Sequence, residues 1–232
     1  MPRLVSIILM AATLASCLRL QDYRKCLHPA NHRITQTSEV SDLRRGMNLG
    51  NALEAPAEGD WGVVLRKEYF RLIKDAGFDT VRIPIRWSAH AGDSAPYSIN
   101  DCFYDRVDWA VFSALGTNMN VVINMHHYDE FTDRPDSQKD RFLSLWEQIA
   151  DHYRDFPDQV VFELLNEPES GFTSIKWNEY LNEAIRLIRK SNPNRKIMVA
   201  PAGPIWSERR AGVPGTTRRG PRGIPGAPGP GP

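Results

Sequence analysis

The chain has 232 residues, of which 41% are hydrophobic and 25% charged, and its formal net charge is +1. This length suffices for one sizeable hydrophobic core. The even charge balance argues against a nucleic-acid partner. The chain has 3 cysteines, and they form no pair or Cys/His cluster with the spacing of metal ligands. We therefore expect no metal and no cofactor.

A short apolar segment follows Arg3, from Leu4 to Ala15. It is too short to span a bilayer, but it suits the hydrophobic region of a signal peptide. The next residues, Leu14-Ala15-Ser16-Cys17, resemble a bacterial lipobox, in which the cysteine is lipidated and becomes the mature N-terminus. We expect residues 1–17 to be a signal peptide with a lipobox, and residues 18–40, which are polar and aperiodic, to be a tether. The protein would then be exported and anchored to the bacterial membrane, in the periplasm or at the cell surface, through a lipid on Cys17. The alternative is a plain secretory signal.

The next part of the chain alternates between strand and helix patterns, which predicts a domain over residues 41–206. Runs typical of buried strands occupy residues 43–49, 80–85, 120–125, 160–165 and 196–200. Apolar residues at helical spacing occupy residues 65–76, 103–114, 142–153 and 177–188. Such a repeat predicts parallel strands with helical crossovers, and so an α/β fold. Both an open doubly wound sheet and a (β/α)8 barrel fit this pattern.

Polar side chains gather where these strands end, and this favours the barrel. No GxGxxG or Walker-type loop follows any strand, which disfavours nucleotide-binding folds. Polar groups at the carboxyl ends of successive strands are typical of the (β/α)8, or TIM, barrel. Pro168 has no N–H and ends the fourth strand, which leaves Glu167 at such an end. The strand-end residues are Asn48, Asn51, Arg82, Arg86, His126, His127, Asn166 and Glu167.

Four motifs at these strand ends resemble glycoside hydrolase family 5, the cellulase family. They are Arg-Gly-Met-Asn-Leu-Gly-Asn-Ala-Leu-Glu at 45–54, Val-Arg-Ile-Pro-Ile-Arg-Trp at 81–87, Met-His-His-Tyr at 125–128 and Leu-Asn-Glu-Pro at 165–168. The resemblance covers about residues 40–206. It implies a barrel that hydrolyses O-glycosidic bonds of a β-linked polysaccharide, a β-glucan or β-mannan, with retention. It also implies one catalytic glutamate at the end of strand four and another at the end of strand seven.

The resemblance implies a role for individual residues. Glu167 matches the acid/base, and Asn166 matches the asparagine that holds the sugar 2-hydroxyl. Arg82 matches the arginine that keeps the nucleophilic carboxylate ionised, and His126 matches a histidine of the same network. Further candidates for sugar contacts are His127, Asn51, Trp61 and Trp87, although either tryptophan could instead pack in the interior. Glu163, which has the strand parity of Glu167, is expected to be structural and paired, for instance with an arginine.

The chain departs from this family pattern after Trp206. From Ala211 to Pro232, 13 of 22 residues are glycine or proline, so we expect residues 207–232 to be a disordered tail. About five βα units are present where the family has eight, and no glutamate follows Glu208. We therefore expect a truncated or frameshifted chain that lacks the strand-seven nucleophile. Three interpretations remain: a cellulase-like endoglucanase represented by part of its sequence, a non-catalytic carbohydrate-binding fragment, and a non-functional fragment.

Overall fold

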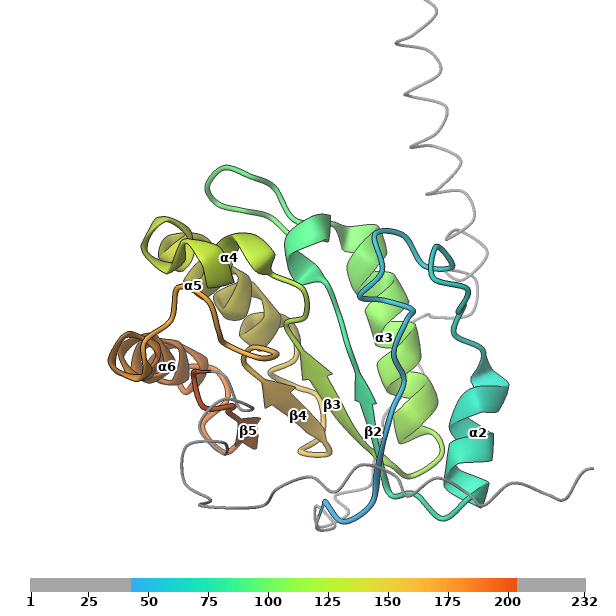
Figure 1. The fold of residues 1–232 in the computed structure, drawn as a ribbon. Coiled ribbons are helices and arrows are strands. Elements are labelled where there is room, and N and C mark those ends of the chain that lie inside the picture. Colours follow the sequence, from blue (N-terminus) through green and yellow to red (C-terminus); the bar gives the residue numbers. More distant parts are fainter. Residues whose placement is uncertain (1–42, 204–232) are drawn as a thin grey trace, which may run out of the picture.

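The computed structural model describes residues 43–203 (Figure 1). The predictions for residues 1–40, including lipidation of Cys17, and for the tail 207–232 lie outside the described residues. Within residues 43–203, no helix has both the length and the apolar character needed to cross a membrane.

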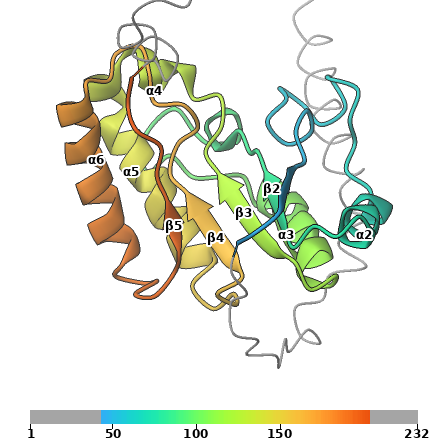
Figure 2. The ribbon, with the colours of Figure 1, turned by 60° about the horizontal axis from the view of Figure 1, so that its bottom comes forward.

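A parallel sheet of five strands forms the centre of the described region (Figures 1 and 2). Its order is β1-β2-β3-β4-β5, so each strand pairs with the next one along the chain. A doubly wound sheet reverses its strand order, whereas a barrel wall does not. The sheet is therefore the wall of an incomplete (β/α)8 barrel, as predicted. The strands are β1 (Gly46–Asn48), β2 (Thr80–Ile83), β3 (Asn120–Asn124), β4 (Val160–Glu163) and β5 (Ile197–Met198).

Helices connect the strands and cover the sheet. Figure 2 shows α2 and α3 beside the β1–β3 end of the sheet and α5 and α6 beside the β4–β5 end. Two short helical segments, η2 and α4, lie in the connections that leave β2 and β3. The helices are α2 (Lys67–Asp75), η2 (Trp87–His90), α3 (Asp101–Leu115), α4 (Asp129–Asp133), α5 (Pro135–His152) and α6 (Ser174–Ile188).

The two faces of the sheet differ in polarity because side chains alternate along a strand. On β2, Val81 and Ile83 are fully buried in the hydrophobic core, whereas Arg82 between them is half-buried. The strand register places Asn48 beside Arg82, and Asn124 beside Glu163. One face of the sheet therefore packs against the helices, and the other carries polar side chains toward the barrel interior.

Helix boundaries differ from the predicted ones where polar residues begin a helix. α5 starts at Pro135, seven positions before the predicted start at 142, and α4 was not predicted. Proline is favoured in the first turn of a helix, but the polar residues that follow Pro135 carry no apolar period. α3 starts at Asp101 because the side chain of Asn100 accepts hydrogen bonds from the amides of Cys102 and Phe103.

Candidate active site

Hydrogen bonds beyond the strand ends bring the predicted site residues together. The amide of His126 donates to the carbonyl of Ile85 (2.8 Å), which ties the end of β3 to the end of β2. The amide of Asn166 donates to the carbonyl of Met125 (2.9 Å), which ties the end of β4 to β3. The polar residues that follow these three strands therefore share the carboxyl edge of the sheet.

Arg82 lies at the centre of this edge. Its Nε donates to Oε2 of Glu163 (2.6 Å), and its Nη2 donates to Oε1 of the same carboxylate (2.7 Å). The pairing expected for Glu163 is confirmed, and the partner is Arg82. The two-pronged geometry suits a guanidinium and could not be reproduced by lysine. The carboxylate of Glu163 is almost wholly buried, so Arg82 and not water neutralises its charge.

The Arg82 guanidinium also orients two amides. Its Nη1 donates to Oδ1 of Asn48 (2.8 Å), and its Nη2 donates to Oδ1 of Asn166 (2.9 Å). Since the Asn166 oxygen faces Arg82, the amide nitrogen Nδ2 is directed elsewhere. No residue within 43–203 binds that Nδ2, so it is available to donate to a ligand oxygen.

His126 is held as a neutral imidazole. Its Nδ1 lies 3.0 Å from Nδ2 of Asn124. Burial, together with the nearby positive charge of Arg82 and the neighbouring His127, lowers the pKa of His126 to about 3. The rings of His126 and His127 meet edge to face at 4.5 Å between centroids, and Trp61 meets His127 in the same way at 5.5 Å. The rings of Trp61, His127 and His126 thus form a cluster that borders the site.

Three site residues adopt the left-handed backbone region that side chains other than glycine rarely occupy. The φ angles are 65° for Asn51, 49° for His127 and 45° for Glu167. Each residue follows a different strand end, after β1, β3 and β4. Such backbone conformations concentrate at functional sites, where the surrounding fold holds them in place. Glu167 is exposed, and within residues 43–203 no group donates a hydrogen bond to its carboxylate.

The two tryptophans predicted as sugar platforms have different environments. Trp61 has 43% of its surface exposed, so its ring is accessible. Trp87 is fully buried, its Nε1 donates to the carbonyl of Asn124 (3.0 Å), and its ring packs against Phe103 and Tyr104. The proposed sugar contact for Trp87 is therefore wrong, because no face of its indole is open to a ligand. The alternative, packing in the interior, is the one the structure shows.

Sequence reasoning missed Glu54 and Asn124. Glu54 is buried, and its carboxylate accepts hydrogen bonds from the amides of Asn51 and Ala52, which fixes the turn after β1. Asn124 is fully buried at the end of β3. A polar residue closing the apolar run Val121-Val122-Ile123 was the available signal.

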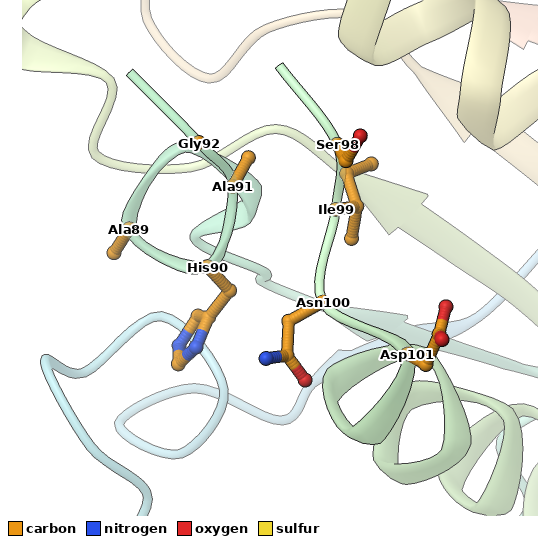
Figure 3. Close-up of a pocket in the computed structure, with 8 residues that line it drawn as sticks. All are labelled: Ala89, His90, Ala91, Gly92, Ser98, Ile99, Asn100 and Asp101. Carbon is orange, nitrogen blue, oxygen red and sulfur yellow. The ribbon is translucent and has the colours of Figure 1, made fainter. Parts of the chain in front are cut away.

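A separate surface hollow of about 710 Å³ lies between η2 and the start of α3 (Figure 3). None of the predicted site residues lines it. Among its polar side chains, Asn100 caps α3, and His90 stacks on Phe103 with 3.7 Å between ring centroids. The polar edge described above, and not this hollow, is the candidate active site.

A barrel wall with a charged and amide-lined carboxyl edge is the architecture of an α/β-barrel enzyme. The chain matches the sequence model of Cellulase (glycosyl hydrolase family 5) over residues 43–220. The protein therefore belongs to glycosyl hydrolase family 5.

Similar proteins include endoglucanases of bacteria. The chain is 36% identical to Endoglucanase H of Acetivibrio thermocellus over 168 residues, which are 72% of this chain and 18% of that protein. It is 32% identical to Endoglucanase A of Ruminococcus albus, covering 66% of this chain and 45% of that one. The chain thus spans less than half the length of these relatives.

Among solved structures, Cel5A of Thermotoga maritima in complex with cellobiose is similar, with a TM-score of 0.68 and 53% identity over 69% of this chain and 52% of that chain. Cel5A in complex with mannotriose has a TM-score of 0.69 and 49% identity, over 76% of this chain and 58% of that chain.

Proposed function

We propose that the protein acts as a retaining, endo-β-1,4-glucanase-like glycoside hydrolase with Glu167 as its acid/base. One observation carries the proposal: Glu167 stands exposed at the end of β4, directly after an asparagine whose amide is oriented by Arg82. Glu167 would protonate the leaving glycosidic oxygen and later deprotonate the attacking water. Asn166 would donate Nδ2–H to a sugar hydroxyl. His126, His127, Asn51 and Trp61 would contact the sugar.

The second carboxylate of a retaining pair would come from outside residues 43–203. Retention needs two carboxyl groups about 5–5.5 Å apart, one of which attacks the sugar carbon. Glu163 and Glu54 are buried carboxylates beside the site, but Arg82 binds both oxygens of Glu163, and backbone amides bind both oxygens of Glu54. Oxygens that are already hydrogen-bonded in this way suit a structural carboxylate and not a nucleophile that attacks the sugar. This arrangement also supports the second candidate function, a carbohydrate-binding fragment in which the described part of the site binds sugar without cleaving it.

The substrate we propose is a β-glucan or a β-mannan. The support is the likeness to Cel5A, whose structures were determined in complex with cellobiose and with mannotriose. Both sugars carry hydroxyl groups, which amide and imidazole donors of the kind gathered here can bind.

The decisive experiment completes the barrel. Residues 1–203 are joined to the remainder of Thermotoga maritima Cel5A, and hydrolysis of carboxymethyl cellulose and β-mannan is compared with that of the 232-residue chain. We expect hydrolysis from the chimera and none from the chain itself. Hydrolysis by the 232-residue chain would overturn the proposed origin of the second carboxylate. Sugar binding without hydrolysis in both proteins would favour the binding fragment.

Within the active chimera, Glu167→Gln tests the acid/base. Loss of the proton donor should lower turnover of polysaccharide by roughly 10²–10⁴-fold, because general acid catalysis contributes that much. Aryl glycosides with good leaving groups should lose less in the glycosylation step. Glu169→Gln, which neutralises a second exposed glutamate two residues away, is the control and should change little. Equal, small losses on both substrates would exclude the role for Glu167.

We also propose that the protein is exported and anchored by a lipid on Cys17. The support is the Leu14-Ala15-Ser16-Cys17 sequence after a short apolar segment. In a bacterial host, labelled fatty acid should be incorporated into the full chain, and Cys17→Ser should abolish the label. A soluble mature protein that begins after Cys17 would show a plain secretory signal instead.

A further inference from the structure

The side chain of Asn124 joins three parts of the site. It lies at the end of β3, fully buried between β2 and β4. Its Oδ1 accepts from the amide of Ile85 (3.2 Å), and its Nδ2 donates to Oε1 of Glu163 (3.4 Å). The same Nδ2 lies 3.0 Å from Nδ1 of His126. Every donor and acceptor direction of this amide except one oxygen lone pair is therefore used.

Two of these partners fix which way the amide faces. The backbone N–H of Ile85 can only donate, so it requires the oxygen of Asn124 on its side. The carboxylate of Glu163, bound by Arg82, can only accept, so it requires the NH₂ group on the other side. A flipped amide would set donor against donor and oxygen against carboxylate, and would lose both bonds.

The orientation of Asn124 determines the tautomer of His126. Because Nδ2 can only donate, Nδ1 of His126 must accept and cannot carry a proton. A neutral imidazole without a proton on Nδ1 carries it on Nε2. No residue within 43–203 binds Nε2.

We propose that Asn124 is a positioning residue, which holds His126 as the Nε2–H tautomer so that the ring offers a fixed N–H donor to a sugar oxygen. The bonded series Arg82–Glu163–Asn124–His126 transmits the orientation: the guanidinium fixes the carboxylate, the carboxylate fixes the amide, and the amide fixes the ring. The claim that a sugar oxygen accepts this hydrogen bond rests on the proposed function, whereas the claim about the tautomer does not.

The surroundings of His126 keep it neutral, which a tautomer requires. The charged or titratable groups that face the ring are Arg82 and His127, and Asn124 links the ring to a third such group, Glu163. Burial is the main reason that the ring stays neutral, and the nearby Arg82 and His127 act in the same direction. Glu163 is paired with Arg82, so the two opposite charges partly offset each other at the ring.

The test is NMR of the 232-residue chain labelled with ¹⁵N at histidine and asparagine. The two-bond ¹H–¹⁵N correlation pattern of an imidazole distinguishes the Nε2–H tautomer, the Nδ1–H tautomer and the imidazolium. His126→Gln identifies the signal by its loss. We expect the Nε2–H pattern near neutral pH, with an N–N scalar coupling across the hydrogen bond from Asn124 Nδ2 to His126 Nδ1.

Two variants change the partner of Nδ1. Asn124→Asp replaces a donor by an acceptor, so the proton should move to Nδ1 or the ring should become imidazolium. Asn124→Leu removes both functions, so the pattern should become an average of the two neutral tautomers. Asn192→Asp is the matched control, because Asn192 lies in the α6–β5 connection, is also buried, and bonds Ala150 of α5 and Arg195. It should leave the His126 signal unchanged.

An Nδ1–H pattern in the parent chain would overturn the proposal, as would an unchanged Nε2–H pattern in a folded Asn124→Asp variant. If both Asn124 variants fail to fold, the N–N coupling and the His126 tautomer measured in the parent chain still decide whether the proposal holds. The measurement needs no substrate and no turnover. A failed hydrolysis assay would therefore count against the proposed function, and a different tautomer would count against the role of Asn124.

Discussion

At the scale of single residues, burial fixes the protonation state of two histidines, His126 in the candidate site and His90 in the separate hollow. His126 and His90 are both held neutral, with pKa values lowered to about 3 and about 4, in each case first by burial and then by a nearby arginine. The arginine is Arg82 for His126 and Arg86 for His90. Neutral imidazoles can accept at one nitrogen while donating at the other, which an imidazolium cannot.

These lowered pKa values predict how stability depends on pH. A histidine whose folded pKa lies below the ordinary value of 6.5 binds its proton more readily in the unfolded chain. The free energy of unfolding should therefore fall as the pH drops from about 6.5 toward 4. Urea unfolding across this range should show a smaller fall for His90→Gln/His126→Gln than for the parent chain.

Asp79 and Asp136 contribute over a lower pH range than the two histidines. Their pKa values lie below the ordinary 3.8, lowered mainly by hydrogen bonds from Thr80 and Lys176, so their contribution is lost as the pH falls below that value. An identical pH dependence in the parent and the double variant would contradict the assignment to these two histidines.

At the scale of elements, the strands were predicted better than the connections between them. All five strands lie inside their predicted ranges. Buried apolar runs are a local signal for β2, β3 and β4, whereas β1 and β5 are half-buried or exposed. α4 and the first turns of α5 were not predicted, because their residues are mostly polar and their position depends on contacts with segments that are distant in the sequence. The connection from β4 to α6, which contains Asn166 and Glu167, shows such a dependence.

Gly171 packs this connection against α4. Its amide donates to the carbonyl of Thr132 (2.7 Å). A Cβ at this position would lie 2.7 Å from both that carbonyl oxygen and Cδ of Pro135. Gly171→Ala should therefore force the connection away from α4 and lower the free energy of unfolding by about 1–3 kcal/mol.

Gly46→Ala on β1 is the control for this substitution, because a Cβ there would have no neighbour closer than 3.9 Å. Both variants can be compared by urea unfolding with the same baseline. Equal stability of the two variants would show that the β4–α6 connection is not held by close packing at Gly171.

At the scale of the whole molecule, the described sheet has two edges. Within residues 43–203, β1 and β5 each pair with one neighbour only. Apolar side chains are exposed at both edges: Met47 is 38% exposed on β1, Met198 is 41% exposed on β5, and Val199 after it is 51% exposed. In a closed barrel such edges are paired and covered.

Covering these edges should stabilise the fold. Joining residues 1–203 to the remainder of Thermotoga maritima Cel5A should raise the midpoint of thermal unfolding above that of the 232-residue chain, because apolar surface leaves water and strand edges gain partners. A fusion of residues 1–203 to an unrelated domain of similar size is the control. Equal midpoints for the two fusions would mean that the exposed edges do not limit stability.

The sequence by itself determined the five strands, the α/β class, the family and the candidate residues of the site. These follow from contiguous patterns: apolar runs, helical periods and motifs of four to ten residues. It also predicted that Glu163 is paired, from strand parity, but it could not name the partner. Likewise, it could not choose between packing and sugar contact for Trp87, since burial is not a property of neighbouring residues alone.

Only the tertiary structure decided which side chains meet. Arg82 and Glu163 are 81 positions apart, and Ile85 and Asn124 are 39 apart, yet each pair is hydrogen-bonded. Parallel strands bring such residues together because their carboxyl ends lie at one edge, and the strand register then selects the partners. The orientation of the Asn124 amide, and with it the proton position on His126, depends on two such distant partners, Ile85 and Glu163, which is why a local pattern in the chain does not reveal it.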